Sequence, residues 1–251
     1  MNLTRAQKQK LFKEGYLKIA SVISAKQINL ALRTINHSLG KGIDPRQIDK
    51  YRAGSYCPEL TQHPAITDLL YGSDVWGMVT SLTAEDKMTL WGGAQIALRF
   101  PVMQRPSELH PHLDGMHRPG NRIPEGTVQS FTMLVGVLLS DVPNEFWGNF
   151  TVWPGSHRLF EQYFRKHGTG VLLEGLPPVP LPDPHQLLGK SGDVILCHYQ
   201  TAHTVVSNVS PYIRYAVFFR LMHQNHKENT NRVLTDIWLE WDGMRETISK
   251  E

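Results

Sequence analysis

From about Leu90 onward, short apolar runs alternate with Gly, Pro, Asn and Asp, and this pattern restricts the fold more than any other feature. Such runs, rich in β-branched and aromatic residues and bounded by turn formers, are typical of β-strands. The strand candidates are AQIALRF, VQSFTMLVGVLLSDV, NFTVW, GDVILCHY, AHTVVSN and RYAVFFRLM. Many short strands in one block favour a sandwich or barrel over β-α-β units.

The part of the chain before this block has helical signals. Thr4 with Gln7 forms a capping-box pattern, which predicts a short helix ending near Gly15. Residues 24–40 predict a clearer helix, with a second capping-box pattern at the start, apolar residues at helical spacing and a terminal glycine. Residues 66–82 are a third, less regular candidate. Between the first two, YLKIASVI is β-like, and the closing TDIWLEWDGMRETI suggests a C-terminal helix.

The length of 251 residues fits one domain. We expect residues 1–251 to form it, with a helical part over about 1–89, a β-rich part over about 90–223 and an extension over 224–251. The net charge of +3, without a basic run, gives no reason to expect nucleic acid. The N-terminus is polar, and no apolar stretch reaches the roughly 18 residues that span a bilayer. A cytoplasmic protein with no membrane partner is expected, of unknown oligomeric state.

The segment HPHLDGMH contains a candidate metal-binding pair. In a strand, residues two apart project from the same face, so His112 and Asp114 can present an imidazole and a carboxylate to one point. His203, in CHYQTAHTVVSN, is the candidate third ligand. Two histidines and one carboxylate form the facial triad of non-haem Fe(II) oxygenases, which leaves three coordination positions open. A bidentate 2-oxo acid and dioxygen would fill these positions.

Basic and polar residues of the β-rich block are candidates for binding that 2-oxo acid. Arg214 lies eleven residues after His203, so a hairpin could return it to the same cavity. Its guanidinium group suits the distal carboxylate of a diacid. Gln95 and Arg99 share one face of AQIALRF, and Ser130 and Thr132, which share strand parity on the next strand, could supply a hydroxyl, with Thr132 as the candidate. We therefore predict a cosubstrate pocket of Arg214, Gln95, Arg99 and Thr132.

These motifs, in this order, resemble the phytanoyl-CoA hydroxylase-like family of Fe(II)- and 2-oxoglutarate-dependent dioxygenases. The resemblance runs from about residue 4 to 222 and includes LTRAQKQKLFKEGYLKIASVIS, HPHLD, VWPGSH and SGDVILCHYQTAHTVVSNVSPYIRYAVFFRL. It implies a double-stranded β-helix, or jelly roll, with the N-terminal helices packed outside. It also implies an oxidoreductase with His112, Asp114 and His203 as iron ligands and Arg214 as the 2-oxoglutarate-binding residue.

The resemblance further implies a hydroxylase that uses 2-oxoglutarate and O2 and releases succinate and CO2. Asp114 favours hydroxylation, desaturation or cyclisation over halogenation, because related halogenases replace this carboxylate with a small residue. Asn208 and the turn from Pro154 to His157 are expected to be structural. The sequence departs from the family in EFWGNF, which keeps Gly148 but has Phe and Trp where the family usually has Glu and Asn.

The substrate cannot be identified from these motifs, although a small organic or natural-product-type molecule is expected. The loop GMHRPGNRIPEG starts beside Asp114, and its His117, Arg118 and Arg122 could form a positive rim that selects an anionic substrate. Two alternatives stay open. One is a non-catalytic β-helix protein that retains a metal, and the other is a cupin-type metal isomerase, which would not need Arg214.

Overall fold

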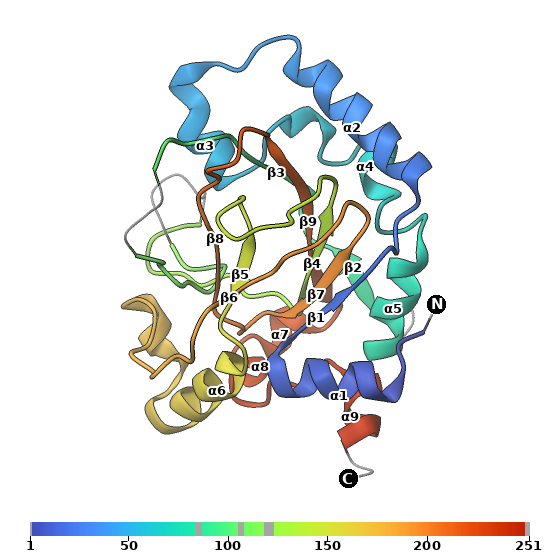
Figure 1. Cartoon of the computed structure of the whole chain (residues 1–251). Coiled ribbons are helices and arrows are strands. Elements are labelled where there is room, and N and C mark those ends of the chain that lie inside the picture. The colour runs from blue at the N-terminus through green and yellow to red at the C-terminus, as the bar shows by residue number, and fades with distance from the viewer. Residues whose placement is uncertain (1, 84–86, 105–107, 118–122, 249–251) are drawn as a thin grey trace.

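The computed structural model describes residues 2–83, 87–104, 108–117 and 123–248, and its strands form two antiparallel sheets (Figure 1). The larger sheet has the order β1 (Tyr16–Ile19), β7 (Val194–His198), β4 (Met133–Leu138), β9 (Arg214–His223) and β2 (Met88–Leu90), and β3 (Gln95–Arg99) also pairs with β9. The smaller sheet has the order β6 (His185–Gln186), β5 (Phe150–Val152) and β8 (His203–Val205). The prediction of a strand-rich fold with helices is therefore confirmed, and its sheets are antiparallel.

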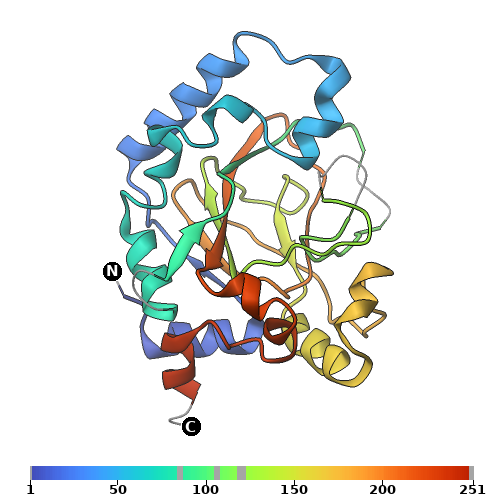
Figure 2. The same ribbon diagram turned by 180° about the vertical axis from the view of Figure 1, so that it is seen from behind.

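Helices surround the sheets without entering the space between them (Figures 1 and 2). They are α1 (Arg5–Glu14), α2 (Ala25–Leu39), α3 (Ile48–Ala53), α4 (Pro64–Thr67), α5 (Asp74–Leu82), α6 (Ser156–His167), α7 (His226–Asn229), α8 (Arg232–Thr235) and α9 (Asp242–Ile248). Short 3-10 helices span Pro45–Gln47, Pro58–Leu60 and Thr169–Leu173. The C-terminal helices return beside the earlier ones, α9 against α1 and α8 against α6 (Figure 2).

Local sequence signals fix the first two helices as predicted. Thr4 and Ser24 each cap a helix, and each forms a complete capping box with the glutamine three residues later. The third candidate was only partly right, because residues 66–82 lie in two helices that are separated by a turn and restarted by the Ser73 cap. The helix α6, whose first two residues are the Ser-His of the Pro-Gly-Ser-His motif, was not predicted.

The two faces of the larger sheet pack against different partners. On β9, Val217, Phe219 and Leu221 belong to a hydrophobic cluster that includes residues of α1, α2 and α5. Ala216 and Phe218 face the other way, into a second cluster that includes Phe150 and Val152 of the smaller sheet. Alternation along a strand therefore gives this sheet one face covered by helices and one face directed at the smaller sheet.

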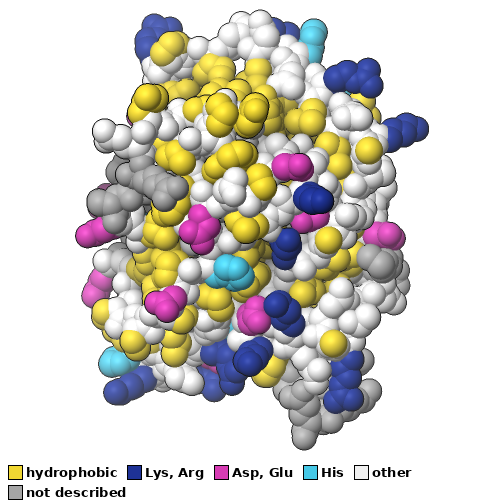
Figure 3. Space-filling view, viewed as in Figure 1, with side chains coloured by type: hydrophobic (Ala, Val, Ile, Leu, Met, Phe, Trp, Pro, Cys, Tyr) yellow, Lys and Arg dark blue, Asp and Glu magenta, His cyan; other side chains and the backbone are white. Residues whose placement is uncertain are grey.

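The surface carries no obvious single-sign region on the face seen in Figure 1. Hydrophobic side chains gather over its middle and upper parts, and side chains of both charges are interspersed among and around them (Figure 3). Among the described residues, no helix combines the length and the apolar character that a membrane span requires.

Candidate metal centre

Two segments that are distant in the sequence bring the three predicted ligands together. His203 begins β8, and His112 pairs with it through two backbone hydrogen bonds, each 3.0 Å long. The predicted strand for the His-x-Asp motif is an isolated bridge followed by a turn. The same-face geometry nevertheless holds, because Leu113 is buried between the two ligands while His112 and Asp114 turn toward the pocket.

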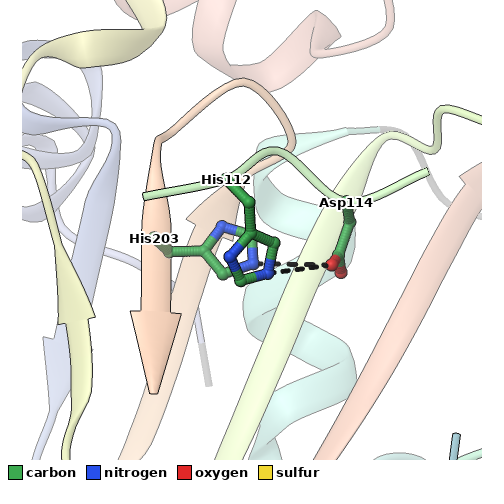
Figure 4. Close-up of side chains that lie close together, drawn as sticks. All are labelled: His112, Asp114 and His203. Carbon is green, nitrogen blue, oxygen red and sulfur yellow. Dashed lines mark ion pairs between the residues drawn. The ribbon is translucent and has the colours of Figure 1, made fainter. Parts of the chain in front are cut away.

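The ligand atoms converge on one point (Figure 4). The Nε2 atoms of His112 and His203 each lie 3.6 Å from Oδ1 of Asp114. All three donor atoms lie within 4.8 Å of one another. Two atoms bound to one metal at about 2.1 Å can be at most about 4.2 Å apart, so both histidine–aspartate distances suit a shared ion.

The hydrogen bonds of His203 prepare its ring to bind a metal. Its Nδ1 lies 2.9 Å from the carbonyl oxygen of Thr201, which can only accept a hydrogen bond, so the proton is on Nδ1. The lone pair is therefore on Nε2, the atom that faces Asp114. Phe150 packs against this ring at a centroid distance of 5.3 Å and limits its rotation. Such outer contacts fix the tautomer and orientation of metal-binding histidines.

Arg220, which was not predicted as a site residue, holds the carboxylate of Asp114. Its Nε and Nη2 donate to Oδ2 of Asp114 at 3.0 and 2.7 Å, and its Nη1 donates to Oε1 of Gln95 at 3.0 Å. Burial raises the pKa of Asp114, but Arg220 and the two histidines outweigh burial and hold it well below its usual range. Asp114 is therefore a carboxylate with one oxygen occupied and the other facing the histidines.

The turn after Asp114 depends on a glycine. Gly115 has a φ of 82°, and a Cβ atom there would lie 2.1 Å from the carbonyl oxygen of Gln129. The backbone nitrogen of Gln129 also donates to the carbonyl oxygen of Gly115. A side chain at this position would push the two segments apart and would move Asp114 with them.

The three predicted ligands line a pocket of about 220 Å³ between the two sheets. Gln95 and Arg99 line it from β3, as predicted, and Arg220 and Phe218 line it from β9. Arg220 could have been found from the sequence, because it shares strand parity with Arg214. That parity does not, however, indicate which carboxylate it meets.

Arg214 lies beside Arg99, its partner in the β3–β9 register, and is almost fully buried. Its Nη1 donates to the carbonyl oxygen of Ala97, while its Nε and Nη2 find no hydrogen-bond acceptor among the described residues. Burial and the neighbouring Arg99 lower the pKa of Arg214 to about 9. A buried cation with unused donors is costly, so this position favours a bound anion. Arg214 is not among the described lining residues of the 220 Å³ pocket, which Arg99 lines; it lines a different pocket together with Trp147.

Gly148, the glycine kept in EFWGNF, makes room for this arginine pair. Its φ is 75°, and a Cβ atom there would lie 3.0 Å from Cβ of Arg99 and 3.2 Å from Cβ of Arg214. Asn208 supports the same end of the sheet, where its Nδ2 donates to the carbonyl oxygens of Arg99 and Tyr212. The structural role expected for Asn208 is thus visible in its contacts.

The structure does not bring Thr132 into the pocket. Its hydroxyl donates to Oε2 of Glu240 at 2.6 Å and accepts from the backbone nitrogen of His223. Strand parity correctly gives the face but not the position along the strand, and Thr132 lies just before β4 begins, under the C-terminal segment. It is therefore committed to a structural network and not to the cosubstrate pocket.

The predicted positive rim can be only partly located. His117 is exposed, and its Nδ1 lies 2.6 Å from the carbonyl oxygen of Ile123. Arg118 and Arg122 lie outside the described residues. The other histidine of interest, His157, is buried at the start of α6, where its Nε2 bonds the carbonyl oxygen of Phe12. It is structural, as expected.

Comparison with known proteins shows similarity in fold. No family model and no curated protein matches the chain. Among solved structures, the non-haem α-ketoglutarate-dependent carbocyclase SnoK from nogalamycin biosynthesis aligns with a TM-score of 0.59 and 18% identity over 88% of this chain and 84% of that one. HygX from Streptomyces hygroscopicus, with nickel and 2-oxoglutarate bound, aligns with a TM-score of 0.56 and 17% identity over 88% and 87%.

A third similar structure is EctD from S. alaskensis with 2-oxoglutarate and 5-hydroxyectoine, at a TM-score of 0.56 and 16% identity over 88% of this chain and 76% of that one. Identities this low establish a shared fold only. The resemblance to the phytanoyl-CoA hydroxylase-like family stays a prediction.

Proposed function

We propose that this protein is an Fe(II)- and 2-oxoglutarate-dependent oxygenase built on a double-stranded β-helix. The observation that carries the proposal is the convergence of His112, Asp114 and His203 at one point between two antiparallel sheets. The fold shared with SnoK, HygX and EctD supports it. SnoK is named as dependent on α-ketoglutarate, which is 2-oxoglutarate, and the structures of HygX and EctD contain 2-oxoglutarate.

The described residues fit both of the groups that the proposal requires, which are Fe(II) and 2-oxoglutarate. Two neutral imidazoles and one carboxylate are the donor set of a non-haem Fe(II) site with open positions. The unused donors of buried Arg214, with Arg99 beside it, fit the distal carboxylate of 2-oxoglutarate. When bound, iron and 2-oxoglutarate would let dioxygen, the oxidant, attack a substrate C–H bond, with one oxygen atom going to the substrate and the other to the succinate that forms with CO2.

The chain's own residues would bind and orient these groups. His203 presents Nε2 because Thr201 holds its other nitrogen, and Asp114 presents Oδ1 because Arg220 holds its other oxygen. Phe150 and Phe218, whose ring centroids are 5.3 Å apart, form an apolar wall of the pocket. That wall limits the access of water to the reacting atoms and keeps the polar contacts strong.

Hydroxylation of an unactivated C–H bond in a small organic substrate is the reaction we propose. The carboxylate of Asp114 fills the position that a halogenase would leave open for chloride. Two of the similar structures contain small organic molecules, hygromycin B in HygX and 5-hydroxyectoine in EctD. Because SnoK is a carbocyclase, ring formation is the closest alternative outcome.

The direct test is the turnover of 2-oxoglutarate without an added substrate. The wild type, supplied with Fe(II), ascorbate and 2-oxoglutarate, should form succinate slowly, and His203→Ala should not. A protein that binds iron and 2-oxoglutarate but forms no succinate, even across a broad screen of small organic substrates, would be a non-catalytic binding protein instead.

A further inference from the structure

A second cavity lies beside the metal pocket. A groove of about 410 Å³ lies between the α3 region and the segment from Trp91 to Gln95. Gln95 and Arg220 line both this groove and the metal pocket, so the two spaces share a wall. Arg52 and Ala53 of α3 line the metal pocket as well. A molecule in the groove would therefore lie against the residue that holds Asp114.

The charged groups of the groove are cations. Lys50 and Arg220 line it, and no Asp or Glu is among its described lining residues. Lys50 is exposed and has no carboxylate partner among the described residues, whereas Arg52 pairs with Asp49 at 3.8 Å. Arg220 uses three of its five N–H groups on Asp114 and Gln95, which leaves two for a ligand.

Most neutral polar groups of the groove already have partners. The hydroxyl of Ser55 donates to the carbonyl oxygen of Tyr56 and accepts from the nitrogen of Ile96. The hydroxyl of Thr61 donates to the carbonyl oxygen of Pro58, and the amide of Gln47 donates to Asp44. These groups have little capacity left for a ligand, so recognition falls to the cations.

Two half-buried aromatic side chains complete the wall. Tyr51 packs against Tyr56, and Trp91 packs against Phe131 at a centroid distance of 6.4 Å. Arg220 lies over the same Phe131 ring, 5.8 Å from its centroid. The backbone nitrogen of Trp91 also donates to the carbonyl oxygen of Arg220, which holds the two segments side by side. Flat apolar surface thus lies next to positive charge.

We propose that this groove binds the substrate, and that the substrate is a small organic anion carrying a ring. Its acidic group meets Lys50 and the free N–H groups of Arg220, and its ring lies along Trp91 and Tyr51. The volume is within the usual range for small-molecule sites, about 300–1,000 Å³. This inference rests on the proposed function, since it takes the metal pocket as the place of reaction.

The test measures the binding of simple probes, which does not depend on turnover. The full chain, with and without Mn(II) and 2-oxoglutarate, is titrated by ligand-observed NMR with 1-naphthoate, 2-naphthoate and indole-3-acetate. Matched probes are the neutral amide of each acid, which keeps the ring, and propionate, which keeps only the charge. We expect at least one ring-bearing acid to bind about tenfold tighter than its amide and than propionate, an increment of roughly 1.4 kcal/mol.

Variants locate the binding. Lys50→Ala should weaken binding of the acid by up to about fivefold, as for an exposed charge pair, and Lys50→Glu should weaken it further. Added salt should weaken binding to the wild type. Lys26→Ala, which removes an exposed lysine of α2 outside the groove, is the matched control and should change nothing.

Three results would overturn the proposal. They are equal affinity for acids and amides, unchanged affinity in Lys50→Glu, and displacement of the acid by 2-oxoglutarate with Mn(II), which would place the acid in the cosubstrate pocket. Failure of all probes to bind would count against it equally. Absence of succinate formation, in contrast, would refute the proposed function and leave the binding result standing.

Discussion

Arg220 donates two hydrogen bonds to the same oxygen of Asp114, at 3.0 and 2.7 Å, and thereby leaves the other oxygen facing His112 and His203. The two residues are 106 positions apart and meet because the fold brings β9 beside the turn that carries Asp114. A carboxylate held in this way is oriented to give a metal one oxygen and not two.

Replacing Arg220 should weaken metal binding although Arg220 is not a ligand. In Arg220→Met the carboxylate of Asp114 loses both hydrogen bonds and can rotate, and loss of such an outer contact typically costs 10–100-fold in metal affinity. Titration with Mn(II) or Co(II) measures the change. Gln95→Ala, which removes only the contact on the far side of Arg220, should have a smaller effect. Equal metal affinity in wild type and Arg220→Met would show that Asp114 is oriented by other contacts.

Gly115→Ala should damage both stability and metal binding. The new Cβ would lie 2.1 Å from a backbone oxygen of Gln129, and the positive φ adds about 1–2 kcal/mol for a non-glycine residue. Gly126→Ala is the matched control, because its φ is 72° but nothing lies within 4 Å of the new Cβ. Thermal unfolding and a Co(II) titration compare the two. Similar losses in both variants would mean that the close approach to Gln129 is unimportant.

Arg214 and Arg99 should differ in their effect on 2-oxoglutarate. Arg214→Met removes the buried donors that have no protein partner, and losing one side of such a pair costs about 2–5 kcal/mol, or roughly 30-fold or more in affinity. Arg99→Met should have a smaller effect, and neither variant should change Mn(II) affinity greatly. Arg99, and not Arg214, is among the described residues that line the metal pocket. A larger effect of Arg99→Met would therefore place the distal carboxylate on the β3 side of that pocket.

Acid should destabilise the fold before most carboxylates titrate. Burial lowers the pKa of His198 to about 4, and burial and His198 lower that of His157 to about 3. The unfolded chain takes up protons below pH 6.5 while the folded chain does not, so stability is full above pH 6.5 and falls as the pH decreases. Between pH 6.5 and 5, His198 alone should cost about 2 kcal/mol, since each pKa unit is worth about 1.4 kcal/mol.

Urea unfolding of the metal-free protein between pH 7.5 and 5 measures this slope. His198→Gln should be less stable at pH 7.5, because the ring packs against Trp238 and Trp241 and bonds the carbonyl oxygen of Ile237. Its stability should nevertheless fall less steeply with decreasing pH. A slope as steep as that of the wild type would mean that His198 is not held neutral by the fold.

The success of the sequence predictions depended on how local each signal was. The Thr4 and Ser24 caps and the His112–Asp114 spacing lie within a few residues, and the structure reproduces all of them. Arg220 was missed because its partner, Asp114, lies in a turn far from β9 in the sequence. Thr132 was placed on the correct face, but no local signal showed that Glu240, from the far end of the chain, would bond it.

The central claim is that one metal at His112, Asp114 and His203 also holds 2-oxoglutarate. Anaerobic addition of Fe(II) and then 2-oxoglutarate to the metal-free protein tests it most directly, because chelation of a 2-oxo acid by Fe(II) produces a visible charge-transfer absorption. We predict a saturable band in the wild type with one iron per chain, and no band in His203→Ala or with succinate in place of 2-oxoglutarate. Iron binding without such a band, or an equal band in His203→Ala, would contradict the account.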